Sequence, residues 1–233
     1  MPVLVLDTCS GTFSVGVVTR EKVLSEISGG MGRTHASKLL PAVKQAFDLC
    51  SMALADMEAI AVTRGPGSFT GLRIGIATAK GLALAAQKPL VGISPLAALA
   101  ANAPFCGRSV WAALDAKRGQ VFAACYNLES GFPLALTREM ALTPEQWLEQ
   151  VVGPAVFVGE GASRYRNFLL ERLGNKALFA PPSCCLIKAG AAGALAYDAL
   201  NKGLADTAQS LFPVYLRQAD AKPPQQKAPG KPA

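Results

Sequence analysis

The chain has 233 residues, of which 51% are hydrophobic and 17% charged, and it carries a formal net charge of +7. This composition can bury a sizeable core, and it excludes a disordered chain, a fibrous protein and a large multidomain assembly. The last sixteen residues supply +2 of the charge, the remainder is only mildly basic, and no run of five or six like charges indicates a nucleic-acid-binding arm.

Cysteine usage and hydropathy predict a cytoplasmic protein. The six cysteines include no C-x-x-C pair and are irregularly spaced, which favours free thiols in a reducing compartment. The first residues have no basic segment, and their short apolar run ends at Asp7, unlike a signal peptide. The longest charge-free stretch, 89–107, is interrupted by Gly92, Pro95 and Pro104, so no membrane association is expected.

The first half of the chain alternates between strand and helix patterns. Strands are expected at 3–6, 13–18, 22–28, 59–63 and 90–93. Helices are expected at 34–50, at about 70–87, and after Ser94 and Pro95, which supply an N-cap and a first-turn proline. Pro41 lies inside the first of these helices and should bend it.

The second half repeats this order. Strands are expected at 110–115, 121–126, 134–142 and 155–158, and helices after the capping box at Thr143, at about 163–173 and at 186–200. We therefore predict an α/β protein of two related lobes, 1–106 and 107–217. Residues 218–233 are rich in Lys, Pro and Gln and lack the apolar side chains needed for order.

Catalytic motifs are scarce. His35 is the only histidine, which excludes a two-histidine metal site within one chain, and a lone histidine near a helix start is more often a capping or surface residue. Gly65, Gly67 and Ser68 follow a strand and precede a helix, a setting in which backbone amides hold phosphate. The spacing fits neither a Walker loop nor a dinucleotide fingerprint, so a plain tight turn is the alternative.

The helix at 70–87 has an unusual composition. Gly71, Gly75 and Ala79 recur every fourth residue, with Thr78 and Leu82 beside them. Glycine inside a helix costs about 1 kcal/mol relative to alanine, so another backbone should approach closely. That backbone is either a strand of the same lobe or a helix of a second chain.

The preceding helix carries more apolar surface than a thin lobe needs, at Leu39, Leu40, Val43 and Phe47. Together the two helices are predicted to form half of a four-helix interface with a partner.

Four stretches resemble one known family. They are VLDT at 5–8, RGPGSFTGLRIG at 64–75, ALDAKRG at 113–119 and PVYLR at 213–217. In this order they resemble the TsaB (YeaZ) family, the dimerisation subunit of the bacterial complex that makes N6-threonylcarbamoyladenosine in tRNA. The similarity runs from residue 2 to about 219.

The resemblance implies two RNase H-like lobes of the actin-like ATPase and sugar-kinase (ASKHA) superfamily. It also implies that catalysis, with its metal and nucleotide, belongs to the paralogue TsaD, and that the ATPase TsaE docks on the pair. The expected substrate is the adenosine 3′ of the anticodon in tRNAs that read codons beginning with A. The partner interface would comprise first-lobe helix residues, namely His35, Leu39, Leu40, Val43, Phe47, Gly71, Gly75, Thr78, Ala79 and Leu82.

Departures from the paralogue's pattern favour a non-catalytic role. The stretch 91–98 lacks the two metal-binding histidines of TsaD. Of the superfamily's phosphate loops, Asp7 and Thr8 retain the first, but the second lobe offers only the glycines at 159 and 161. Gln120 stands where the family usually has Glu. With Gly65, Gly67 and Ser68, Asp7 and Thr8 are therefore predicted to form a vestigial phosphate loop without tight ATP binding or a metal.

Two other functions remain as alternatives. A weakly nucleotide-binding enzyme, either a small-molecule kinase or a metallopeptidase-like protein, would need metal ligands or both phosphate loops. A stand-alone RNA-binding module would need a basic stripe with interleaved aromatics, and aromatic residues make up only 7% of the chain. We expect tRNA to be contacted through the complex, and the isolated chain to form a homodimer through the same helices.

Overall fold

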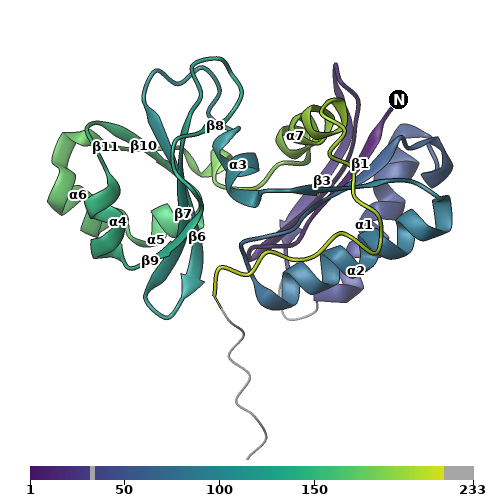
Figure 1. The fold of residues 1–233 in the computed structure, drawn as a ribbon, viewed down its shortest axis with the longest axis horizontal. Helices are drawn as coiled ribbons and strands as arrows, with labels where there is room; N and C mark the ends of the chain where they lie inside the picture. The colour runs from purple at the N-terminus through teal and green to yellow at the C-terminus, as the bar shows by residue number, and fades with distance from the viewer. Residues whose placement is uncertain (32–34, 218–233) are drawn as a thin grey trace, which may run out of the picture.

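The computed structural model describes residues 1–31 and 35–217, without the side chains of residues 35–37. Two sheets, each with its own helices, lie side by side (Figure 1). The first contains β1 (Val3–Asp7), β2 (Thr12–Val18), β3 (Val23–Gly30), β4 (Ala59–Thr63) and β5 (Leu90–Ile93). Its strand order is β3-β2-β1-β4-β5, with β1, β2 and β3 antiparallel and β1, β4 and β5 parallel.

The second sheet repeats this topology. It contains β6 (Ser109–Lys117), β7 (Gln120–Asn127), β8 (Leu134–Ala135), β9 (Met140–Leu142), β10 (Ala155–Val158) and β11 (Ala177–Phe179). Its order is β11-β10-β6-β7-β8, and β9 also pairs with β7. The prediction of an α/β protein with two related lobes is confirmed. The run expected as one strand at 134–142 is divided into β8 and β9, and β11 was not predicted.

Three of the described helices begin at residues whose side chains cap them. The α-helices of the described chain are α1 (His35–Cys50), α2 (Phe69–Ala86), α3 (Pro95–Ala100), α4 (Pro144–Gln150), α5 (Glu160–Arg164), α6 (Arg166–Leu173) and α7 (Ala189–Asn201). The side chains of Ser68, Ser94 and Thr143 accept backbone hydrogen bonds at the starts of α2, α3 and α4. The expected cap of α1, Thr34, lies outside the described residues. No helix in the described part of the chain is long and apolar enough to cross a bilayer.

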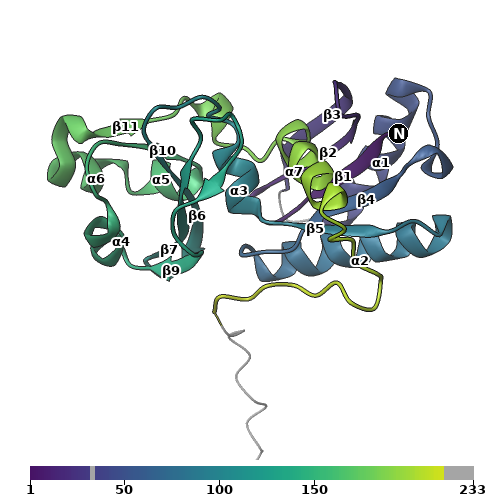
Figure 2. The same ribbon diagram turned by 45° about the horizontal axis from the view of Figure 1, so that its top comes forward.

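The predicted extent of the second lobe, 107–217, needs a correction, because α7 packs on the first sheet against β1, β2 and β5 (Figures 1 and 2). The Tyr197 hydroxyl lies 2.7 Å from the carbonyl oxygen of Met1 and 2.8 Å from that of Val18. Gly193 faces Val18 so closely that an added Cβ would lie 2.8 Å from it. The small residues of α7 allow this close approach. Helix α7 therefore packs on the first lobe, although it follows the second lobe in the sequence.

Helices cover both faces of the first sheet. Leu4, Leu6, Ile60 and Val62 pack with buried residues of α1 and α2 on one face. Val3, Val5, Ala59 and Ala61 pack on the other face in a cluster that includes α3 and α7. Neighbouring residues of a strand point to opposite faces of the sheet. Since helices cover both faces, every residue of β1 and β4 is buried.

The segment after α7, residues 202–217, crosses the first lobe on its way to the gap between the lobes (Figure 2). We call it the C-terminal strap. Leu211 is fully buried in the core beneath α2, and the Val214 amide donates a 2.7 Å hydrogen bond to the Arg64 carbonyl oxygen. The strap therefore brings residues 214–217 to the second lobe.

Candidate functional site

A cleft of about 810 Å³ lies between the two lobes. The first lobe contributes the turn after β1 and the loop that opens α2, and the second contributes the tip of the β6–β7 hairpin and the start of α5. The C-terminal strap closes one side. The lining residues are Cys9, Ser10, Gly11, Gly67, Ser68, Phe69, Thr70, Arg73, Asp115, Ala116, Lys117, Arg118, Phe122, Glu160, Val214, Tyr215, Leu216 and Arg217.

Asp7, at the end of β1, is a buried carboxylate behind the first-lobe wall of the cleft. Its Oδ1 accepts hydrogen bonds from the Thr63 hydroxyl at 2.7 Å and from the Cys9 amide at 3.2 Å, while Oδ2 has no partner. Burial raises the pKa of Asp7 against these hydrogen bonds. Burial and the Asp7 charge also raise the pKa of Cys9 well above its ordinary value, so this cysteine is a thiol at neutral pH and not an activated nucleophile.

The predicted phosphate-loop residues divide between the cleft and the core behind it. Gly67 and Ser68 line the cleft, whereas Asp7, Thr8 and Gly65 are buried behind them. The Ser68 amide donates to the Cys9 carbonyl oxygen at 2.7 Å, which holds the loop against the end of β1. Gly65 has a φ of +116°, and an added Cβ would overlap the Val214 carbonyl oxygen of the strap. This glycine therefore serves the packing of the strap as well as the turn.

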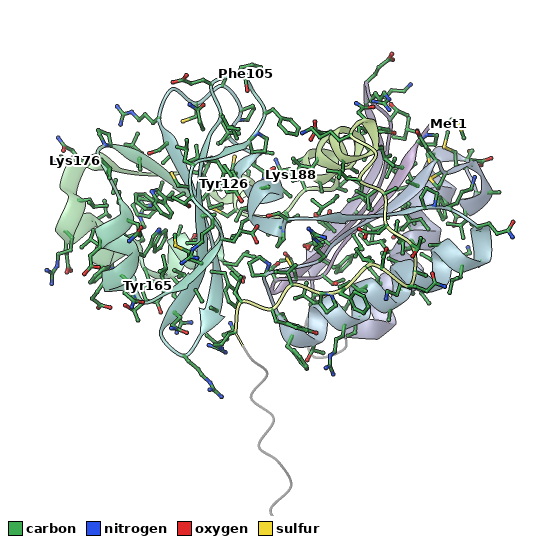
Figure 3. The ribbon with its side chains drawn as sticks, in the orientation of Figure 1. Met1, Phe105, Tyr126, Tyr165, Lys176 and Lys188 are labelled. Atoms are coloured by element: carbon green, nitrogen blue, oxygen red, sulfur yellow. The ribbon has the colours of Figure 1, made fainter. Side chains whose placement is uncertain are left out.

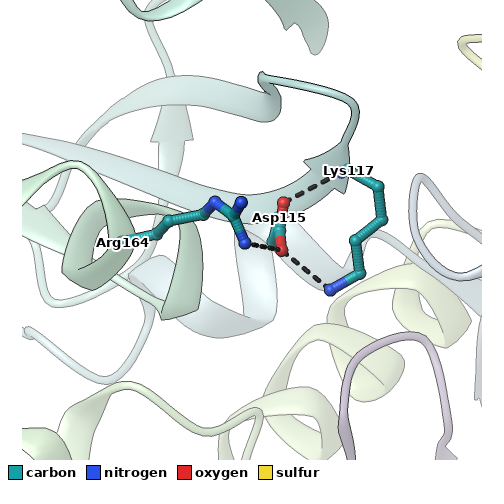
Figure 4. Close-up of polar contacts among 3 residues, drawn as sticks. All are labelled: Asp115, Lys117 and Arg164. Atoms are coloured by element: carbon teal, nitrogen blue, oxygen red, sulfur yellow. Dashed lines mark hydrogen bonds and ion pairs between the residues drawn. The ribbon is translucent and has the colours of Figure 1, made fainter.

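The second-lobe wall contains an ion-pair cluster at Asp115, shown in Figure 4. The Asp115 carboxylate lies 2.8 Å from the Lys117 ammonium and 3.2 Å from the Arg164 guanidinium, and only 7% of its side chain is exposed. Burial opposes the charged form, but the hydrogen bonds from Lys117 and the charges of Lys117 and Arg164 outweigh it. The pKa of Asp115 is therefore lowered.

An Asp115→Asn substitution should remove a pH-dependent contribution to stability. Because the folded-state pKa is lowered, the contribution is present above the ordinary value of 3.8 and is lost as pH falls through the folded value. We expect a loss of about 1 kcal/mol at neutral pH, or a fall of about 2–4 °C in Tm. Melting both proteins between pH 3 and pH 8 checks this, and a Tm difference that grows toward acid would contradict it.

Glu160 extends from the second lobe to the first across the cleft. Burial raises the pKa of Glu160, against the opposing effects of the Lys117 charge and of the Asp115 and Gly11 backbone. An ideal Cβ on Gly11 would lie 3.6 Å from Glu160 Oε2. A carboxylate of the second lobe therefore faces the turn after β1 at the cleft.

Metal-binding clusters are also missing from the described residues, where no three His, Cys, Asp or Glu side chains could hold an ion. The cleft thus combines a protonated thiol, the Glu160 carboxylate with its raised pKa, the ion-paired Asp115 carboxylate with its lowered pKa, and several cations. These groups can bind an anion at the rim, but they supply neither a thiolate nor a metal centre.

The structure corrects half of the predicted partner interface. Leu39, Val43, Gly71, Gly75 and Ala79 are buried within the first lobe. A Cβ on Gly71 would overlap the Thr8 carbonyl oxygen, and one on Gly75 would overlap the Thr8 hydroxyl. The backbone that approaches these glycines is therefore the end of β1, not a helix of a partner.

The outer surface of α1 and α2 exposes apolar side chains at several positions. Leu40 is 55% exposed and Leu84 62% exposed, while Phe47, Thr78 and Leu82 are partly buried. Gly81 is exposed, with no atom within 4 Å of an added Cβ. The side chain of His35 lies outside the described residues. Sequence reasoning overlooked Leu84 and Gly81, although both lie within the predicted helix.

Comparisons with known proteins relate this chain to proteins of tRNA threonylcarbamoyladenosine biosynthesis. The family model for "TsaD: tRNA N6-adenosine threonylcarbamoyltransferase" matches residues 17–224. The tRNA threonylcarbamoyladenosine biosynthesis protein TsaB of Bacillus subtilis is 30% identical over 95% of this chain and 96% of its own. YeaZ from Pseudomonas aeruginosa superposes with a TM-score of 0.78 at 33% identity, over 92% of this chain and 99% of that one.

A more distant structure shares the fold alone. Component A of the Acidaminococcus fermentans (R)-2-hydroxyglutaryl-CoA dehydratase has a TM-score of 0.54 at 13% identity, over 86% of this chain and 99% of that one.

Proposed function

This chain belongs to the TsaB (YeaZ) family of tRNA threonylcarbamoyladenosine biosynthesis proteins, and from that premise we propose that it is a non-catalytic scaffold. It pairs with the catalytic paralogue TsaD and helps to recruit the ATPase TsaE in the cytoplasm. The pair then transfers threonylcarbamoyl to N6 of the adenosine 3′ of the anticodon in tRNAs that read codons beginning with A. ATP, ADP and the metal are held by the partner subunits.

The observation that carries the proposal is the apolar outer surface of α1 and α2. We call Leu40 and Phe47 of α1, with Ala77, Gly81 and Leu84 of α2, the helical face. Leu40 and Leu84 are both more than half exposed, and the two helices contact each other on the same side of the first sheet. Burying one leucine side chain completely is worth about 1.5–3 kcal/mol, so both are anchors for a partner.

Gly81 supports the same surface by a different argument. Inside a helix it costs about 1 kcal/mol relative to alanine, and no neighbouring atom of its own chain requires the missing side chain. Ala77, one turn earlier, is also exposed. Small residues at these two positions would let a partner helix approach the α2 backbone closely.

The non-catalytic assignment is supported by the cleft. Cys9 is held as a thiol, and no described cluster is suited to a metal. The cleft volume of about 810 Å³ is the observation that favours the alternative, a weakly nucleotide-binding kinase or metallopeptidase-like enzyme. Hydrolysis of ATP by this chain without TsaD would favour that alternative, and modification of tRNA without TsaD would contradict the scaffold proposal.

Size-exclusion chromatography of this chain mixed with TsaD tests the pairing. A Leu40→Glu, Leu84→Glu double variant should weaken pairing at least about 100-fold, because two anchors are lost and two charges would be buried against an apolar partner. The same variant should reduce the self-association of the isolated chain, measured by light scattering. TsaE should co-elute with the wild-type pair in the presence of ATP and not with the variant.

The matched control is Leu134→Glu, which places the same charge at a 66% exposed leucine of the second lobe. It should pair with TsaD like the wild type. Equal pairing by the helical-face variant and this control would overturn the proposal.

A further inference from the structure

Two aromatic side chains and an arginine stand together at the rim of the cleft, where α2 meets the C-terminal strap. The rings of Phe69 and Tyr215 lie 5.3 Å apart at an angle of 35°, and the Arg73 guanidinium lies 3.9 Å above the Phe69 ring. The Arg73 Nε donates to the Tyr215 hydroxyl at 3.5 Å. Phe69 is 36% exposed and Tyr215 41% exposed, so this stack presents ring surface to the cleft.

The opposite rim is basic. Lys117 and Arg118 form the tip of the β6–β7 hairpin, and Arg217 of the strap lies against that hairpin, with its Nη1 3.5 Å from Gln120 Oε1. Together with Arg73, four cations line the cleft against two acids. Asp115 forms ion pairs with Lys117 and Arg164. Cationic side chains thus outnumber carboxylates among the residues that line the cleft.

The hairpin tip holds its two cations in an unusual backbone conformation. Lys117 has a φ of +60° and Arg118 a φ of +52°, in the left-handed region that residues other than glycine rarely adopt. Such conformations gather at functional sites, where the surrounding structure maintains them. Here the bonds from Lys117 to Asp115 maintain the tip, and they keep Arg118 at the cleft.

We propose that this rim, made of Phe69, Arg73, Lys117, Arg118, Tyr215 and Arg217, binds a single-stranded segment of the tRNA substrate. One unstacked base lies against the Phe69 and Tyr215 rings, and the adjoining phosphates contact the arginines. Aromatic faces beside a cationic groove are the combination that binds single-stranded nucleic acid, because every base has a stacking face and every linkage a negative charge. This inference rests on the proposed function, through which tRNA reaches the complex.

The test measures the binding of an anticodon stem-loop RNA, from a tRNA that reads codons beginning with A, to the complex of this chain with TsaD. Fluorescence anisotropy at several salt concentrations gives both the affinity and its salt dependence. Tyr215→Ala should weaken binding about 10-fold, and Tyr215→Phe, which keeps the ring, should restore most of it. Arg118→Glu should weaken binding and reduce the salt slope by about one unit.

The matched control is Lys176→Glu, which makes the same kind of charge change at the far end of the second lobe (Figure 3). It should bind RNA within about twofold of the wild type. The proposal is overturned if Arg118→Glu and Tyr215→Ala also bind within twofold, or if Lys176→Glu weakens binding equally. It is likewise overturned if ADP or inorganic phosphate displaces the RNA from the rim, since the ligand would then be a free nucleotide or anion.

Chromatography separates this result from the pairing proposal. The rim variants should still co-elute with TsaD, because the rim and the helical face share no residue. If the wild-type chain failed to pair with TsaD, the proposed function would fail, and the same RNA titrations of the chain alone would still decide whether the rim binds RNA.

Discussion

A Gly71→Ala variant should lose much of the stability of the first lobe, although the substitution adds one methyl group. An ideal Cβ at this position would overlap the Thr8 carbonyl oxygen, and the Thr8 hydroxyl donates a 2.8 Å hydrogen bond to the Gly71 carbonyl oxygen. Helix α2 and the end of β1 are thus in backbone contact, and neither can move without breaking buried hydrogen bonds. We expect a loss of about 3 kcal/mol and a fall of about 6–12 °C in Tm, measured by circular dichroism.

The control lies on the same helix. Gly81→Ala adds the same methyl group where no atom lies within 4 Å, so it should raise stability by about 0.5–1 kcal/mol. This pair of variants also distinguishes the two explanations for the glycine repeat. If Gly71 faced a partner, Gly71→Ala would melt like the wild type and fail only in pairing, and that result would contradict the packing described above.

The sequence predicted the elements well because their signals are local. Alternating and helical periodicities and the caps at Ser94 and Thr143 each depend on a few neighbouring residues, and the structure confirms them. The repeat of order between the halves was enough to predict two related lobes. The family motifs then agreed with the relatives found across the chain.

The parts that sequence reasoning missed depend on long-range contacts. The repeat at Gly71 and Gly75 indicated a close backbone, but either of two backbones satisfied the pattern until Thr8 was seen against it. The small residues of α7 gave no sign of which sheet they would cover. Glu160 and Gly11 are separated by most of the chain, and only the meeting of the lobes places them next to each other at the cleft.

The strap residues Tyr215 and Arg217 were visible in the sequence as part of a family motif, without a role. Their positions follow from the return of α7 to the first lobe, which carries the strap back across α2. Tyr215 then stacks near Phe69, the first residue of α2, and Arg217 reaches Gln120. The cleft rim is therefore a product of topology, and local patterns could not predict it.

The second lobe depends on one tryptophan. Trp147 is fully buried, with edge-on ring contacts to Trp111 at 6.2 Å and to Phe157 at 5.4 Å. Trp147→Ala should cost about 3–5 kcal/mol, because it removes these contacts and leaves a cavity that the two sheet residues cannot fill. Urea denaturation followed by far-ultraviolet circular dichroism measures the loss.

Trp147→Phe is the control for Trp147→Ala, and it also separates the aromatic packing from the effect of the indole N–H. The indole Nε1 has no hydrogen-bond partner, so phenylalanine keeps most of the aromatic packing and removes an unsatisfied donor. It should cost less than about 1.5 kcal/mol, and an equal cost for the two variants would show that the packing account is incorrect. Because the helical face belongs to the first lobe, the folded fraction of Trp147→Ala should still pair with TsaD, whereas Gly71→Ala should lose pairing and stability together.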